Sequence, residues 1–167
     1  RIVTPGTNLD TQALDETKNN YIMCIVYIAD RYGVAIADIS TGDYFVTELP
    51  DSSRLMDEIY KFSPSEIICN EAFYMSGMDL DAMRDKLGIT IYSLDSWYFD
   101  DAVCKDKLLE HFKVKNFAGL GLADYDCGII SAGALLIYLF ETQKNSLSNL
   151  THITPYITGK YMLIDSS

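Results

Sequence analysis

The chain has 167 residues, of which 49% are hydrophobic and 12% aromatic, which is enough for one domain with a sizeable core. Its net charge is −11, from 24 acidic and 13 basic residues, and the basic residues are scattered rather than gathered into a stripe. Such a field repels phosphate backbones and argues against a module that grips nucleic acid by charge.

The cysteines and the longest apolar run argue against a disulfide framework, a zinc site and a membrane span. No C-x2-C pair occurs, and only two histidines could join the thiols, so we expect four reduced structural cysteines in a cytoplasmic protein. The apolar run over residues 127–140 is too short to cross a bilayer and predicts a buried helix. The four cysteines are Cys24, Cys69, Cys104 and Cys127.

The first third of the chain predicts a short lead-in helix followed by a three-stranded meander. Residues 9–20 place apolar side chains near one helical face. Three apolar runs then cover residues 21–28, 34–39 and 44–49, and their short connections contain Gly and Asp, which is typical of hairpins. The first run is apolar on both alternating faces, so it should be the central strand and covered on both sides.

Helices and strands alternate after the meander. Asp124 or Asp126 can cap the last helix, in which Gly128 and Gly133 leave room for close backbone contact. Beyond it, residues 153–164 predict an extended connector. In chain order we expect a helix over residues 52–62, a strand over 66–70, a helix over 79–87, a strand over 89–94, a helix over about 101–113 and a long helix ending near 144.

This order of elements is that of the ribonuclease H-like α/β fold. In that fold three antiparallel strands are extended by two parallel strands, and helices cover both faces of the sheet. A doubly wound, flavodoxin-like sheet is the other candidate. It would require a helix between the first strands, where the connections hold only four or five residues.

Catalytic groups are not apparent on this fold. A nuclease of this class needs acidic side chains that converge on two metal ions, one of them from the middle of the first strand, but residues 23–26 are apolar. We therefore expect no catalytic residue and no metal site, with a divergent metal-dependent nuclease as the alternative. The nearest acids, which we interpret as turn, cap and strand-end residues, are Asp30, Asp38, Glu71, Asp124 and Asp126.

Other motifs are equally weak. Gly119-Leu120-Gly121 is a partial dinucleotide fingerprint that follows a helix rather than a strand. His111 and His152 lie near no catalytic signature, so we interpret them as structural or solvated. Trp97, the only tryptophan, is predicted to anchor the core, and an exposed recognition patch is the alternative.

Six ordered motifs nevertheless resemble one family across the whole chain. They resemble the connector domain, domain II, of the bacterial DNA mismatch-repair protein MutS. This resemblance implies a piece excised from a longer protein, with the domain over residues 1–150, a lead-in over 1–20 from a mismatch-binding domain, and a linker over 151–167 toward a lever or core domain. The motifs are RIVTPGT, NNY, VAIADISTGDY, SPSEII, FAGLGL and YMLIDSS.

The resemblance also implies a role. It describes a catalytically silent module that links the mismatch reader to the core and ATPase domains, relays their conformational state and helps to engage MutL. ATP and Mg²⁺ would belong to other parts of the parent protein, neighbouring MutS domains would be contacts, and mismatched DNA would be bound only through the full-length protein.

One helix face is the candidate for MutL contact. With Leu108 and Phe112 directed inward, a helical wheel points three charged residues outward, flanked by one apolar and one charged residue. The resemblance suggests that the helix after the tryptophan contributes to the MutL-facing surface, whereas an ordinary solvated face is the alternative. The outward residues are Asp106, Glu110 and Lys113, and the flanking residues are Val103 and Lys107.

Overall fold

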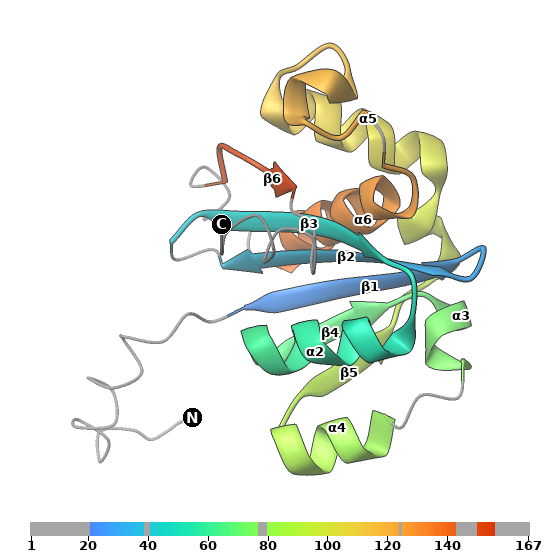
Figure 1. Cartoon of the computed structure of the whole chain (residues 1–167). Coiled ribbons are helices and arrows are strands. Elements are labelled where there is room, and N and C mark those ends of the chain that lie inside the picture. The colour runs from blue at the N-terminus through green and yellow to red at the C-terminus, as the bar shows by residue number, and fades with distance from the viewer. Residues whose placement is uncertain (1–20, 39–40, 77–79, 124, 143–149, 156–167) are drawn as a thin grey trace, which may run out of the picture.

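A six-stranded mixed sheet lies between two layers of helices in the computed structural model (Figure 1). The structure describes residues 21–38, 41–76, 80–123, 125–142 and 150–155. The lead-in helix predicted over residues 9–20 lies outside them. The strands are β1 Ile22–Ile28, β2 Arg31–Asp38, β3 Asp43–Leu49, β4 Glu66–Cys69, β5 Thr90–Ser93 and β6 Thr154–Pro155, in the spatial order β5-β4-β1-β2-β3-β6.

The first three strands form the predicted antiparallel meander, with β1 in the interior of the sheet. The β1–β2 connection is shorter than predicted: only Ala29 and Asp30 form the turn, both with positive φ, as in a type I′ hairpin. Gly33, which we expected in that turn, instead lies in β2 opposite Val26. A Cβ at Gly33 would lie 2.2 Å from the carbonyl oxygen of Cys127, so glycine here permits a helix to cross the strand closely.

Parallel strands extend the meander on both sides. Strand β4 pairs parallel with β1, and β5 pairs parallel with β4. A sixth strand that we did not predict pairs parallel with β3, through Phe45 opposite Thr154. This strand lies within the linker predicted over residues 151–167. Leu150 and Ile153, which precede the strand, are buried in the core, and they hold this part of the chain against the sheet. Residues 156–167, the remainder of that linker, lie outside the described residues.

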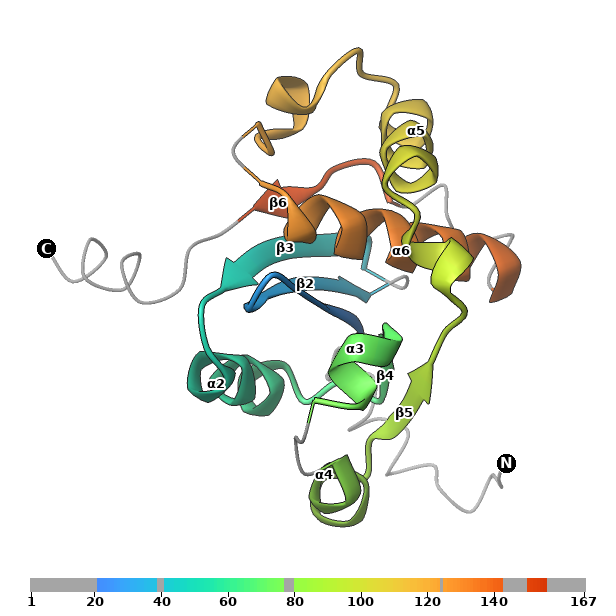
Figure 2. The ribbon, with the colours of Figure 1, turned by 90° about the vertical axis from the view of Figure 1, so that its right-hand side faces the viewer.

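Helices cover both faces of the sheet, as Figure 2 shows. Successive side chains of β1 point to opposite faces of the sheet, and both sets are apolar. Cys24 and Val26 pack against the α5/α6 side, whereas Met23 and Ile25 pack against the α2/α3/α4 side. The mixed α/β class predicted from the sequence is therefore confirmed. The helices are α2 Ser52–Phe62, α3 Glu71–Tyr74, α4 Leu80–Leu87, α5 Asp101–Phe112 and α6 Cys127–Thr142, with 3₁₀ turns η2 Ser96–Phe99 and η3 Phe117–Leu120.

The N-terminus of α6 is held by a side chain from a distant strand. The sequence suggested Asp124 or Asp126 as the cap; residue 124 lies outside the described residues. Glu48 of β3 accepts hydrogen bonds through Oε2 from the backbone N–H of Asp126 at 2.5 Å and of Gly128 at 2.9 Å. The other carboxylate oxygen of Glu48, Oε1, lies 3.3 Å from Nη2 of Arg31. A carboxylate thus satisfies helix N–H groups that would otherwise lack an intrahelical partner.

Candidate partner-binding surface

Helix α5 is fixed on α6 by close packing, which fixes the direction of its outer face. Asp100 caps the helix, because its carboxylate accepts a hydrogen bond from the backbone N–H of Val103 at 3.0 Å. Cys104 and Leu108 are fully buried. A Cβ on Gly133 of α6 would lie 2.4 Å from the Cβ of Cys104, so only glycine permits this approach.

The opposite face of α5 carries the outward residues that the helical wheel predicted. Val103 is 45% exposed, and Asp106, Glu110 and Lys113 are also exposed. Lys113 ends the helix with φ of 59°, and its backbone N–H donates to the carbonyl of Leu109. The surface therefore combines one apolar side chain with charges of both signs.

Lys107 is less available for contact with a partner than its position at the edge of the predicted face indicates. Its Nζ lies 3.9 Å from the centre of the Phe140 ring of α6 and 4.0 Å from the carboxylate of Glu110. The side chain is half-buried, and a cation over an aromatic face is an attractive contact. Lys107 therefore helps to hold α5 on α6, and changing it would perturb packing as well as surface charge.

The prediction that Trp97 anchors the core is wrong. Trp97 is 50% exposed and stacks on Tyr98, with ring centroids 4.0 Å apart. The single turn of η2 directs Tyr98 and Phe99 toward the α5/α6 core and leaves Trp97 outside. The Tyr98 hydroxyl donates to the Glu141 carboxylate, and this hydrogen bond, with a smaller contribution from burial, raises the pKa of Tyr98 to about 12.

The acids considered for a nuclease site are spread over the sheet. Asp30 lies in the β1–β2 turn, where its carboxylate accepts from the Tyr27 hydroxyl at 3.2 Å. Asp38 is buried at the opposite end of the eight-residue strand β2. Glu71 begins α3, and Asp126 precedes α6. Among the described residues, no group of three or more His, Cys, Asp or Glu side chains could hold a metal ion.

The histidines and cysteines have structural surroundings. A ring nitrogen of His111, Nε2, lies 2.8 Å from the carbonyl oxygen of Leu150, and the ring packs edge-on against Phe112 and Phe140. His152 is exposed. All four cysteines are free and buried, as predicted, and burial raises the pKa of the thiols of Cys69, Cys104 and Cys127 to about 12. Such thiols remain protonated and are poor nucleophiles at neutral pH.

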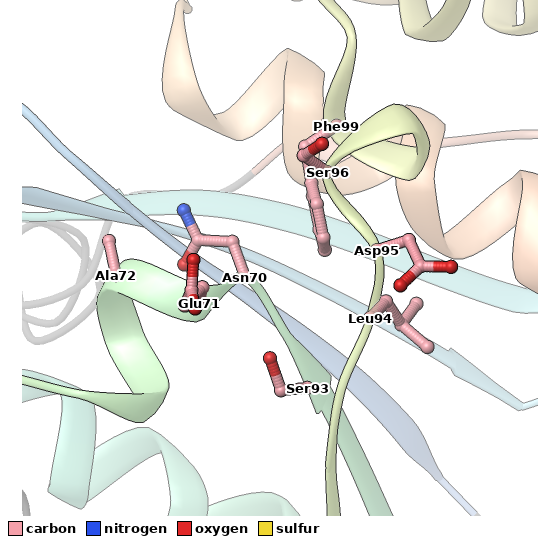
Figure 3. A pocket seen from close by; sticks show the side chains of 8 residues that line it. All are labelled: Asn70, Glu71, Ala72, Ser93, Leu94, Asp95, Ser96 and Phe99. Carbon is pink, nitrogen blue, oxygen red and sulfur yellow. The ribbon is translucent and has the colours of Figure 1, made fainter.

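A pocket that sequence reasoning missed lies beyond the carboxyl ends of β4 and β5 (Figure 3). Its volume is about 500 Å³. The available signal was that two parallel strands end there, and such strands open toward a crevice at their carboxyl ends. The lining residues are Asn70, Glu71, Ala72, Ser93, Leu94, Asp95, Ser96 and Phe99.

Comparison with known proteins gives one consistent family. The profile of a family described as MutS domain II matches residues 20–154. The DNA mismatch repair protein MutS of Lachnoclostridium phytofermentans is 53% identical over 167 residues, which is 100% of this chain and 18% of that protein. The MutS of Dehalococcoides mccartyi is 38% identical over 99% of this chain and 18% of that protein. The chain thus spans about a fifth of the length of these relatives.

One solved structure shows a more distant likeness. Thermus thermophilus RuvC in complex with a Holliday junction substrate is 15% identical, with a TM-score of 0.49, over 77% of this chain and 98% of that chain. A likeness of this size supports no conclusion about function. Within the described residues, no helix is long and apolar enough to cross a membrane.

Proposed function

The chain belongs to the MutS domain II family, and on that premise we propose that it is a non-catalytic connector module of a MutS-type mismatch-repair ATPase. The observation that carries this proposal is the 53% identity to a MutS protein over the whole chain. In this proposal the module links the mismatch-binding domain to the core and ATPase domains and relays their conformational state. ATP, Mg²⁺ and mismatched DNA would be bound by other parts of a longer cytoplasmic protein.

The fold that we propose for this role is ribonuclease H-like. Its support is the antiparallel meander β1–β2–β3 extended by the parallel strands β4 and β5. The nuclease alternative lacks a supporting observation, because the centre of β1 is apolar and Asp30 and Asp38 lie at opposite ends of β2. A module without catalytic groups acts through its surfaces and through the positions of its two ends.

The second part of the proposal is that the outer face of α5 contributes to MutL binding. Three observations support it: α5 is packed firmly on α6, its outer face is exposed, and that face carries an apolar residue among charges. Rims of this composition are common in protein interfaces, where charged residues set orientation and association rate. Val103, Asp106, Glu110 and Lys113 would face the partner, and Lys107 would hold the helix in place.

The test is charge reversal at Asp106 and Glu110, both to arginine, in the 167-residue chain. We expect the double variant to bind MutL more weakly by about 1 to 3 kcal/mol, since interface residues that matter typically cost this much. Folding should change by less than about 0.5 kcal/mol, because both side chains are exposed. Lys107 is left unchanged because of its contact with Phe140. The measurements are a MutL titration and thermal unfolding followed by circular dichroism.

A matched control separates a specific surface from a general charge effect. Asp85 is exposed on α4, on the opposite face of the sheet, and Asp85→Arg should leave MutL binding unchanged. Equal affinity of the wild type and the α5 double variant, at equal melting temperature, would show that the α5 face is only solvated. An equal loss with Asp85→Arg would show that net charge alone controls the association.

A further inference from the structure

The pocket at the carboxyl ends of β4 and β5 is rigidly built. Asn70 forms one wall: its Oδ1 accepts from the backbone N–H groups of Tyr27 and Phe73, both at 3.1 Å, and its Nδ2 donates to the Tyr27 carbonyl at 3.2 Å. The other wall begins at Leu94, whose N–H donates to the Cys69 carbonyl at 2.9 Å. Both walls are therefore tied to the strands, and the space between them is preformed.

The lining offers acceptors and an aromatic ring. Figure 3 shows Asn70, Glu71 and Ala72 on one side, the segment from Ser93 to Ser96 on the other, and the Phe99 ring reaching down between them. In a 3₁₀ turn residues i and i+3 lie on the same side, which explains why Ser96 and Phe99 both line the pocket while Trp97 does not.

Two carboxylates in this lining have no counter-ion. Glu71 and Asp95 are exposed, and neither side chain has a hydrogen-bond or ion-pair partner among the described residues. None of the described residues that line the pocket is basic. Because the chain carries a net charge of −11, its field adds to the local attraction for a cation.

We propose that this pocket receives an arginine side chain from a partner protein. A guanidinium is planar, so it can stack on the Phe99 ring while its N–H groups reach carboxylates, hydroxyls and backbone carbonyls. A pocket of about 500 Å³ has room for this side chain and the adjoining backbone. The negative charge disfavours nucleic acid here. None of the residues that line the pocket belongs to the set on α5 that we propose to face MutL, so this proposal does not depend on that contact.

The probe is an acetylated and amidated peptide, Gly-Arg-Gly-Arg-Gly, titrated into the isotope-labelled 167-residue chain and followed by backbone amide NMR. We expect saturable shifts at the amides of Asn70 to Ala72 and of Ser93 to Phe99. The same peptide with citrulline in place of arginine keeps the shape and removes the charge, and it should bind about tenfold or more weakly. Spermidine, which is a cation without a planar group, should likewise bind about tenfold or more weakly at these amides.

Two variants decide whether the pocket is the site. Glu71→Gln with Asp95→Asn should weaken the arginine peptide about tenfold or more, without loss of fold, because both side chains are exposed. Asp57→Asn with Asp85→Asn removes the same charge from exposed sites on α2 and α4 and should leave affinity unchanged. The proposal would be overturned by amide shifts that do not saturate. It would also be overturned if the citrulline peptide or spermidine bound as tightly as the arginine peptide, or if the two double variants lost the same affinity.

Discussion

Replacing Glu48 with alanine should destabilise the chain far more than an average surface substitution. Only 7% of this side chain is exposed, yet its carboxylate accepts from the N–H groups of Asp126 and Gly128 and pairs with Arg31. The variant would leave the first turn of α6 without its cap and a guanidinium without its partner. Helix α6 covers β1, β2 and β3 (Figure 1), so a loss of order at its N-terminus would weaken the packing of the helix on the sheet.

The magnitude follows from the contacts. Loss of a helix cap typically costs about 0.5 to 2 kcal/mol, and a hydrogen bond to a charged group contributes about 1.5 to 3 kcal/mol. For Glu48 the helix cap and the hydrogen bonds to a charged group are the same contacts, so the two costs are not added. We expect Glu48→Ala to lower the unfolding free energy by about 3 kcal/mol in total. Arg31→Ala should cost under about 1 kcal/mol, since its side chain is 53% exposed and the pair is partly solvated.

Urea unfolding followed by circular dichroism measures both values, and the slope of free energy against urea should stay constant if unfolding remains two-state. Glu110→Ala is the matched control, because it removes an exposed glutamate from α5 and should cost under about 0.5 kcal/mol. The reasoning is refuted if Glu48→Ala is as stable as that control. It is also refuted if Arg31→Ala costs as much as Glu48→Ala, because the helix cap would then contribute nothing.

Three further results are expected. Gly133→Ala should lower the unfolding free energy by about 1 to 3 kcal/mol because of its collision with Cys104, whereas Gly119→Ala, with an ordinary 3.4 Å contact, should be nearly neutral in the same urea experiment. The raised pKa of Tyr98 means that its hydrogen bond to Glu141 contributes fully below pH 10 and is lost as the pH rises through about 12, so the stability difference from Tyr98→Phe should shrink over that range. With Mg²⁺ or Mn²⁺ present, the chain should leave an RNA/DNA hybrid intact, and chelator-sensitive cleavage that co-purifies with it would contradict this.

Much of the fold could be predicted because local patterns agree with the tertiary structure. The β1 run is apolar on both faces, and it lies between β2 and β4 with helices on both sides. Helix α2 also begins and ends as its spacing indicated, with Ser63 at φ of 45° after its last turn. Strand β6 could not be predicted in this way, because two residues give no alternation and its pairing with β3 depends on Leu150 and Ile153 being buried.

The candidate sites were harder to predict than the fold, because they depend on contacts between residues that are far apart in the sequence. The cap that Glu48 provides for α6 joins residues 78 and 80 positions apart, which no local signal records. Lys107 is on the predicted edge of the α5 face, but its position over Phe140 follows from the packing of two helices. The sequence predicts Trp97 in the core because large aromatic residues are usually buried, but in the four-residue turn η2 the side chain of Trp97 remains exposed.

The pocket and the outer face of α5 are joined through a few residues, and this connection bears on how the proposed module would relay a conformational state. Phe99 lines the pocket, and the next residue, Asp100, caps α5 and donates its backbone N–H to the Trp97 carbonyl. A ligand in the pocket would therefore contact the segment that starts the α5 face. Contact alone is not coupling, because allostery requires that binding at one surface changes affinity at the other. If η2 has a single arrangement, the two surfaces bind independently, and the relay that we propose would then have to come from rigid placement of the module between the other domains of a longer protein.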